Sequence, residues 1–136
     1  MSIVGDIIQK SRKIVVKIGS QTLSDEHGAV NHEAMHNIVE QLHALMEKGK
    51  QIIIVSSGAG ICGVGAINKW HRKEDMNYKQ ALCAIGQVEL MMAYKELFWE
   101  YGIHVGQMLL TRDDFGDPTR NLHIRNTLFT LVDEGV

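Results

Sequence analysis

The chain has little cysteine, little proline and no long run of apolar residues. Its two cysteines, Cys62 and Cys83, stand far apart, which excludes a CxxC redox pair and a cysteine-based zinc cluster and predicts buried, reduced thiols. Asp6 interrupts the apolar residues of segment 1–12, so this segment predicts a short amphipathic helix rather than a signal peptide or a membrane span. We therefore expect a cytoplasmic protein.

A concentration of charge of one sign is also lacking. The 14 Lys and Arg residues against 16 Asp and Glu residues give a net charge of −2, and the basic residues are scattered. A protein that binds nucleic acid or a membrane surface needs a basic stripe or patch. The sequence therefore predicts neither a nucleic-acid partner nor a membrane partner.

Three short runs of β-branched or apolar residues predict buried strands. They cover residues 13–18 (KIVVKI), 51–55 (QIIIV) and 103–110 (IHVGQMLL). None alternates strictly between apolar and polar residues, which is typical of parallel strands covered on both faces.

Helical patterns follow each predicted strand. Asn31 can cap a helix whose apolar residues recur every three or four positions and which closes at Gly49. A longer helix, rich in Ala, Leu and Met, is predicted over residues 78–101, where Gly86 makes a break possible. The last helix is predicted over about residues 119–134, after a proline.

This alternation of strands and helices predicts right-handed crossovers over a mostly parallel sheet, an α/β/α layered fold. The hydrophilic segment 68–77 is expected to form an exposed loop. Gly135-Val136 resembles the start of another helix-to-strand transition, and a parallel sheet that stopped there would leave an unpaired edge. We therefore expect residues 1–136 to be the N-terminal part of one truncated domain, with no second domain.

Two loops that follow predicted strands are rich in small residues. In open α/β sheets, ligands bind beyond the carboxyl ends of the strands, where helix N-termini and loop N–H groups converge. The first loop, residues 17–20 (KIGS), can place one positive charge and several N–H donors around a phosphate. The alternative is a lysine on a strand flank before an ordinary turn.

The second loop, residues 56–63 (SSGAGICG), contains three glycines. Glycine lacks a Cβ, so such a run lets a ligand approach the backbone, and Ser57 can offer a hydroxyl. The alternative is a tight strand-to-helix turn without a ligand. The run also fits G-x-G-x-x-G, but that dinucleotide fingerprint belongs after a first strand and requires a later acidic residue at the end of another strand. Glu74 and Asp75 lie instead in the polar segment.

His32, Glu33 and His36 match H-E-x-x-H, in which two histidines one helical turn apart bind zinc and the glutamate acts as the base. The elongated form of this motif requires a glycine and a third histidine where the chain has Val39 and Leu42. We expect the histidines to lie on a solvated helix flank and to bind no metal, which ranks a zinc hydrolase last among the functions considered.

The loops and several later segments resemble the amino-acid kinase family and, within it, the glutamate 5-kinase branch. The first two segments are shared across the family, whereas the later ones are typical of that branch. They follow the family order and spacing from residue 12 onward. The matching segments are 15–20 (VVKIGS), 54–59 (IVSSGA), 79–81 (KQA), 85–87 (IGQ), 101–112 (YGIHVGQMLLTR) and 125–128 (RNTL).

The resemblance implies transfer of the γ-phosphoryl group of ATP, with Mg²⁺, to the side-chain carboxylate of L-glutamate. The product would be γ-glutamyl phosphate, in the first step of proline biosynthesis, made by a cytoplasmic homo-oligomer. The resemblance makes Lys17 catalytic, in contact with the transferring phosphate. The other implied residues are Gly19 and Ser20, which bind ATP beside Lys17, and Ser57, Gly58 and Ala59, which bind the amino acid.

The chain departs from the family pattern at Gln21, where a small hydroxyl residue is usual, at residues 60–62, where small aliphatic residues are usual, and at His123, where asparagine is usual. The resemblance implies that the rest of the glutamate site and most of the nucleotide site follow Val136, so we expect the isolated chain to be inactive. Carbamate, acetylglutamate and aspartate kinases share the early loops. Another acceptor, or a non-catalytic binding module, therefore stays open.

Overall fold

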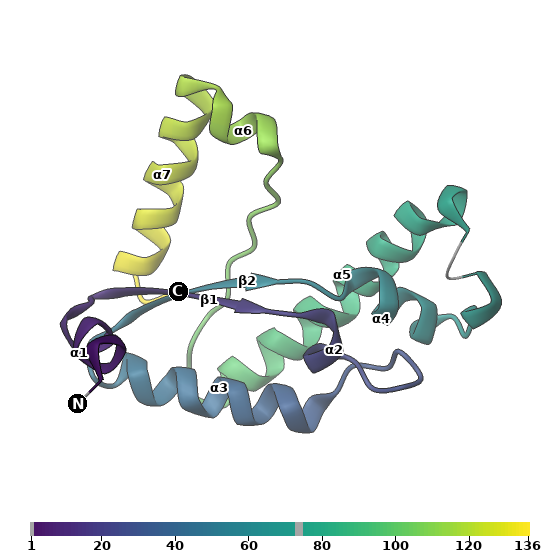
Figure 1. Ribbon diagram of the computed structural model, residues 1–136, viewed down its shortest axis with the longest axis horizontal. Helices are drawn as coiled ribbons and strands as arrows, with labels where there is room; N and C mark the ends of the chain where they lie inside the picture. The colour runs from purple at the N-terminus through teal and green to yellow at the C-terminus, as the bar shows by residue number, and fades with distance from the viewer. Residues whose placement is uncertain (1, 73–74) are drawn as a thin grey trace.

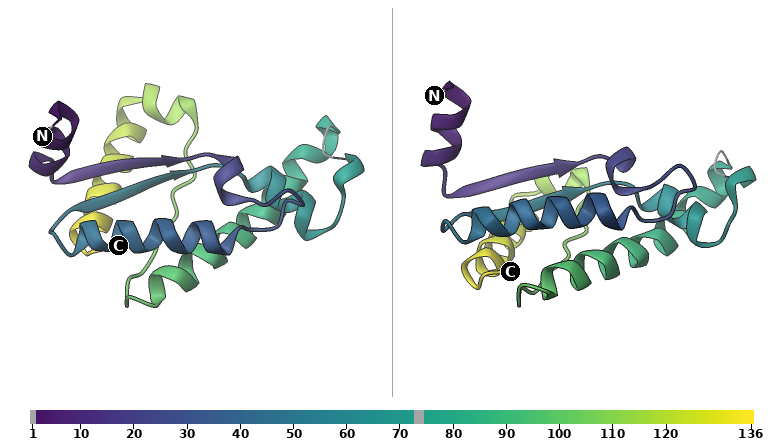
Figure 2. Two further views of the ribbon diagram at one scale, coloured as in Figure 1. Left: turned by 60° about the horizontal axis from the view of Figure 1, so that its bottom comes forward. Right: turned by 90° about the horizontal axis from the view of Figure 1, so that it is seen from below.

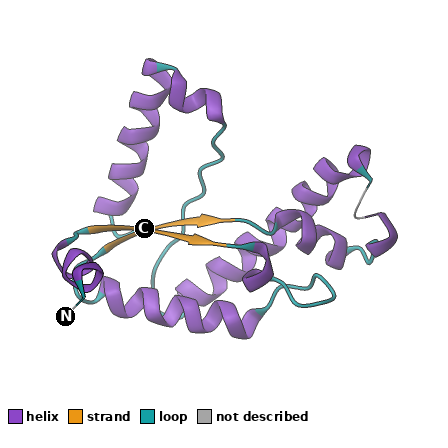
Figure 3. Ribbon diagram, viewed as in Figure 1, coloured by secondary structure: helices purple, strands orange, loops and turns teal. Residues whose placement is uncertain are grey.

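The computed structural model describes residues 2–72 and 75–136. Figures 1 and 3 show a small sheet with helices on both of its faces. In chain order the elements are α1 (Ile3–Lys10), β1 (Lys13–Ile18), α2 (Ser20–Leu23), α3 (His32–Met46), β2 (Gln51–Ser56), α4 (Ala59–Ala66), the 3-10 turn η1 (Trp70–Arg72), α5 (Met76–Trp99), α6 (Arg112–Gly116) and α7 (Pro118–Asp133).

The sheet is parallel and lies between two helical layers. β1 pairs with β2 from Lys13 opposite Gln51 to Ile18 opposite Ser56. On one face Ile18 joins a buried core that α3 and α5 supply, and Figure 2 shows these two helices running along the sheet. On the other face α7 contacts β2, where the Gln51 side-chain amide donates to the carbonyl oxygen of Val132 at 3.1 Å. The predicted α/β/α layering and parallel pairing are confirmed.

Local capping explains where the predicted helices begin. The Asn31 side chain accepts a hydrogen bond from the backbone N–H of Ala34 at 3.0 Å. This bond satisfies one of the backbone donors at the start of α3 that have no partner within the helix. The Asp117 side chain accepts from the N–H of Arg120 at 2.8 Å, and Pro118 occupies the first turn of α7. The helices predicted after Asn31 and over residues 119–134 are therefore confirmed.

α5 runs without a break through Gly86, contrary to the suggested interruption. The glycine is needed for a close contact with another helix. A β-carbon at Gly86 would lie 1.8 Å from the carbonyl oxygen of Ala59, and one at Gly63 would lie 1.8 Å from that of Leu82. α4 and α5 thus approach backbone to backbone at this pair of glycines.

The predicted third strand, residues 103–110, is wrong: within the described residues this segment is extended but pairs with no strand. The prediction that both faces of each strand are covered is also wrong for β1, because Val15, on the α7 side of the sheet, is 63% exposed. The polar segment 68–77 contains η1 and the first two residues of α5, and its residues 73–74 lie outside the described part.

Both cysteines are free thiols, but only one is buried. Cys62 is 1% exposed, and burial is the main cause that raises its pKa. Cys83 is only partly buried, so the prediction of two buried cysteines is half right. Among the helices in the described ranges, none combines the length and apolar character required to cross a bilayer.

Candidate functional site

The two small-residue loops meet at the carboxyl ends of β1 and β2. Ser57 donates two hydrogen bonds, from its backbone N–H and from its hydroxyl, to the carbonyl oxygen of Ile18, both at 3.1 Å. Gly58 adopts the left-handed conformation (φ 99°), and a β-carbon there would lie 3.4 Å from the Cα of Ser20. The fold thereby brings residues 17–20 and 57–59 together, although they are about 40 positions apart in sequence.

Each loop ends in a helix start with free backbone donors. Gly19 precedes α2 and Gly58 precedes α4, and neither start has a side-chain cap. The first helical bonds are donated by Thr22 and Cys62. The donors ahead of them face no described acceptor. They are the N–H groups of Ser20, Gln21, Ala59, Gly60 and Ile61. Unsatisfied N–H groups at helix starts are suited to binding an anion.

Lys17 adds a positive charge beside these donors. Its side chain lies on the sheet face away from the α3–α5 core and is exposed, next to Val55 of β2 in the strand register. Within residues 2–72 and 75–136 it forms no ion pair. No described carboxylate therefore competes with an anionic ligand at the strand ends for this ammonium group.

Ser57 has a structural role as well as a position in the site. Its hydroxyl donates to Ile18, and one hydroxyl can still accept hydrogen bonds through its oxygen lone pairs. The Ile18 carbonyl also receives the Ser57 backbone N–H, so the loops remain tied if the hydroxyl is removed. The Ser57 oxygen is thus available as an acceptor for a ligand ammonium group.

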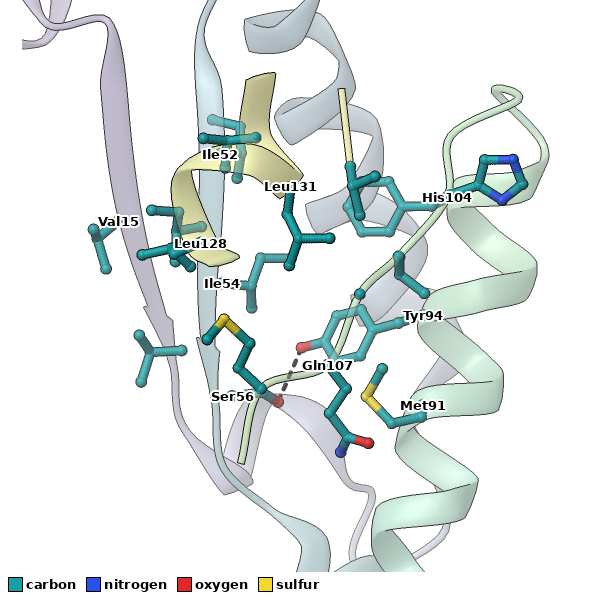
Figure 4. A pocket seen from close by; sticks show the side chains of 18 of the residues that line it. Val15, Ile52, Ile54, Ser56, Met91, Tyr94, His104, Gln107, Leu128 and Leu131 are labelled. Carbon is teal, nitrogen blue, oxygen red and sulfur yellow. Dashed lines mark hydrogen bonds between the residues drawn. The ribbon is translucent and has the colours of Figure 1, made fainter. Parts of the chain in front are cut away.

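A hydrogen bond between Ser56 and Tyr94, two residues that sequence reasoning missed, ties the start of the second loop to α5. The Ser56 hydroxyl and the Tyr94 hydroxyl of α5 lie 3.1 Å apart and share a hydrogen bond (Figure 4). Burial is the main cause that raises the pKa of Tyr94, so the phenol stays neutral at neutral pH. No sequence signal marks Tyr94, since its spacing is that of any core residue of α5.

The glycine-rich loop serves packing more than ligand approach. The sequence pattern does not predict helix α4, because its glycines lower helix propensity. Gly63 faces the backbone of α5, and a β-carbon at Gly60 would meet the Cys83 sulfur at 3.3 Å. Of the three glycines in the loop, only Gly58 has a positive φ and lies against the first loop. The spacing of Ala59 and Gly63, four residues apart, is the signal for close helix packing.

Two of the three histidines of α3 have neighbours from outside that helix. His32 and His36 are exposed, and His36 Nδ1 lies 3.9 Å from a carboxylate oxygen of Glu100, which follows α5. His43 stacks on Tyr101 with ring centroids 4.0 Å apart. In the described portion of the chain no group of three or more His, Cys, Asp or Glu side chains is arranged to hold a metal ion.

Comparison with known proteins adds a relationship along nearly the whole chain. The sequence pattern of the Amino acid kinase family matches residues 12–136. A protein named Glutamate 5-kinase from Alkaliphilus oremlandii is 62% identical over 131 residues, which are 96% of this chain and 50% of that protein. One of the same name from Alkaliphilus metalliredigens is 63% identical over the same shares, and one from Kosmotoga olearia is 42% identical over 91% of this chain and 35% of its own. The chain spans about half the length of the first two relatives.

Proposed function

Because this chain belongs to the amino acid kinase family, we propose that the protein containing it transfers the γ-phosphoryl group of ATP to the side-chain carboxylate of L-glutamate. The name Glutamate 5-kinase of its relatives supports this acceptor. The product would be γ-glutamyl phosphate, an acyl phosphate that enters proline biosynthesis. We place the reaction in the cytoplasm and in a homo-oligomer.

The observation that carries the proposal is the meeting of the two loops. Gly58 lies against Ser20, and Ser57 is hydrogen-bonded to the last residue of β1. Phosphoryl transfer requires positioning and neutralisation of charge more than covalent help from the protein. Both positioning and charge neutralisation can be supplied here, because a lysine, two helix starts with free N–H groups and a hydroxyl lie at one place.

Each loop has a proposed role in the transfer. The Lys17 ammonium group and the N–H groups of Ser20 and Gln21 stabilise negative charge on the phosphate oxygens. The loop from Ser57 to Ala59 holds the amino acid, with the Ser57 oxygen accepting from its ammonium group. An oxygen of the acceptor carboxylate forms the new bond to phosphorus as the bond to the departing ADP breaks.

The chemistry of the loops fits a polyphosphate, because their donors are N–H groups and one ammonium group. Mg²⁺ would offset phosphate charge, and it commonly binds through phosphate oxygens with one or two carboxylates. The described part of the chain holds no group of three or more potential metal-binding side chains that could form a dedicated cage for it. We assign to Lys17 and the backbone donors the neutralisation of the phosphate by this chain.

The test is ADP release by the natural full-length protein that contains this chain. Magnesium, ATP and one acceptor at a time are supplied, from L-glutamate, L-aspartate, N-acetyl-L-glutamate and carbamate. The proposal predicts turnover with L-glutamate and at least about 100-fold lower kcat/KM with the others, since the loss of specific polar contacts costs several kcal/mol.

Two outcomes would contradict the proposal. Preference for another acceptor would move the protein to a different branch of the family. Binding of glutamate without ADP release, measured by calorimetry, would make it a binding module. The 136-residue chain is assayed beside the full-length protein, and we expect it to show no turnover above background.

A further inference from the structure

The carbonyl oxygen of Ser57, in the loop proposed to hold the acceptor, is bound by a side chain. The Ser56 hydroxyl donates to it at 3.3 Å. Within the described residues, no backbone N–H donates to this oxygen. The Ser56 hydroxyl also lies 3.1 Å from the hydroxyl of Tyr94 on α5 (Figure 4). Ser56 therefore connects a carbonyl group of the loop to α5.

The direction of these two hydrogen bonds follows from the number of hydrogens available. A serine hydroxyl donates one hydrogen and accepts through its oxygen lone pairs. Because the Ser56 hydrogen is directed at the Ser57 carbonyl, the hydrogen between Ser56 and Tyr94 comes from the tyrosine. Tyr94 is 5% exposed, and this burial raises its pKa and keeps the hydrogen on the phenol at neutral pH. We call the two bonds, from Tyr94 to Ser56 and from Ser56 to the Ser57 carbonyl, the Tyr94 relay.

The relay holds a peptide group whose orientation the backbone leaves open. On one side the Ser57 N–H donates to Ile18, and on the other the Gly58 carbonyl accepts from Cys62. The peptide group between Ser57 and Gly58 can still turn over. That rotation takes Gly58 from its positive φ of 99° to a negative φ, and glycine adopts both. The Ser56 hydroxyl therefore selects one of two accessible orientations.

The selected orientation presents an N–H group to the site. In a trans peptide group the C=O and the N–H point in opposite directions, and the described chain has no cis peptide bond. Because the C=O points to Ser56, the Gly58 N–H points away from it, and it meets no acceptor within the described residues. This donor joins the free N–H groups at the start of α4. In the reversed orientation, a carbonyl oxygen would take its place and repel a carboxylate.

α5 holds the loop at both of its ends. Tyr94 contacts Ser56 before the loop, and Gly86 lies against the backbone of Ala59 after it. The two contact points are separated by about 12 Å along the helix, at a rise of about 1.5 Å for each residue from 86 to 94. α5 is continuous between them. The position of the Tyr94 hydroxyl relative to the loop is thereby fixed.

We propose that Tyr94 is a positioning residue for the acceptor: through Ser56 it orients the Ser57–Gly58 peptide group so that the Gly58 N–H donates to a carboxylate oxygen of the bound amino acid. The proposal rests on the proposed function, because it takes residues 57–59 as the acceptor site. Tyr94 touches neither substrate and acts through Ser56. Its hydroxyl therefore contributes to acceptor binding, and not to ATP binding or to the chemical step.

The experiment is steady-state kinetics of Tyr94→Phe in the natural full-length protein, with L-glutamate and ATP varied separately. Loss of one neutral hydrogen bond should raise KM for glutamate about fivefold and change KM for ATP and kcat by less than about twofold. The control is Tyr101→Phe. Tyr101 stacks on His43, and of the tyrosine hydroxyls in the described ranges only that of Tyr94 is hydrogen-bonded. Tyr101→Phe should therefore leave all three constants unchanged.

Variants of Ser56 distinguish positioning of the peptide group from packing of α5. Ser56→Ala should raise KM for glutamate by at least about fivefold. Addition of Tyr94→Phe to Ser56→Ala should raise it no further, since the relay is already broken. Ser56→Thr retains the hydroxyl and should keep KM near that of the wild type. A purely structural role of Tyr94 would lower the melting temperature without this coupling in KM.

Three outcomes would overturn the proposal. They are an unchanged KM for glutamate in Tyr94→Phe, an equal rise in KM for ATP, and effects of the two variants that multiply in the double variant. Failure of the proposed function is recognised separately, because it appears in the wild-type protein as turnover of another acceptor or as glutamate binding without ADP release. The variants are then compared by KM for that acceptor or by Kd for glutamate from calorimetry, with the same rise expected. A wild-type protein that binds no acceptor would overturn both proposals.

Discussion

Replacement of Gly86 by alanine tests whether the close α4–α5 contact holds the second loop in place. A β-carbon at this position would lie 1.8 Å from the carbonyl oxygen of Ala59 and 2.3 Å from the nitrogen of Gly63, whereas real contacts stay above 3.0 Å. Both atoms belong to backbone, so the helices must separate. Overpacking typically costs about 1–3 kcal/mol, occasionally more. Two contacts with backbone atoms place Gly86→Ala at the upper end of this range, so the cost outweighs the gain of about 1 kcal/mol in helix propensity.

We therefore expect Gly86→Ala to lower the free energy of unfolding by roughly 2 kcal/mol, the overpacking cost less the propensity gain, measured by urea denaturation followed by circular dichroism. The control is Gly116→Ala, because a β-carbon at Gly116 meets nothing within 4 Å. This control should be neutral or stabilising by up to about 1 kcal/mol. If Gly86→Ala is as stable as the control, the backbone contact between α4 and α5 is not formed as described.

The same variant links packing to function. Ala59 directly follows Gly58, so a shift of α4 moves the loop proposed to hold glutamate. In the active full-length protein, Gly86→Ala should raise KM for glutamate by a larger factor than KM for ATP. Equal changes in both constants would show that the loop does not bind the acceptor.

Three further tests concern the second loop, the cap of α6 and the histidines of α3. Ser57→Ala should raise KM for glutamate about tenfold, the effect of one lost hydrogen bond to a charged group. The melting temperature should change little, since the backbone N–H of residue 57 still donates to Ile18. Steady-state kinetics and a thermal scan measure these two effects, and an unchanged KM for glutamate would contradict the role of Ser57. Hydrogen bonds from the Thr111 backbone and hydroxyl lower the pKa of Asp114, so the cap of α6 is intact above the ordinary aspartate pKa of about 3.9 and is lost as pH falls through the lower folded value. A pH titration of the Thr111 amide by NMR should show this loss, and Asp114→Asn should remove the transition. Protein purified without a metal column should contain no stoichiometric zinc by elemental analysis; bound zinc that disappears in His36→Ala would contradict this.

Local patterns are sufficient to predict the elements whose own residues determine them. The helix after Asn31 has its cap and its apolar periodicity within one segment, and both appear in the structure. The runs predicted as strands over residues 13–18 and 51–55 form the parallel pair 13–18 and 51–56, because each is a short β-branched run followed by a turn. The two candidate loops also meet, since the carboxyl ends of parallel neighbours lie at the same edge of a sheet.

Features that depend on a partner cannot be predicted in this way. Residues 103–110 have a strand-like sequence, but a strand also requires a paired neighbour, and the described chain supplies none. Within its own helix, Gly86 resembles a position where the helix could break. Glycine is needed there because the backbone of Ala59, 27 positions away in sequence, leaves no room for a β-carbon. Helix α4 is rich in glycine and is stabilised by this tertiary contact rather than by propensity.

The measurement that tests the central claim most directly is kcat of Lys17→Met beside Lys13→Met in the full-length protein, with glutamate, ATP and magnesium. Both lysines lie on the same face of β1, but Lys17 is at the loop end and Lys13 is at the other end, 5.3 Å from the Phe129 ring centroid. Loss of one preorganised charge-stabilising donor lowers kcat by about 100-fold or more. The account predicts such a loss for Lys17→Met and near-normal turnover for Lys13→Met. Near-normal turnover of Lys17→Met, with the protein folded, would remove this lysine and its loop from the phosphoryl-transfer site.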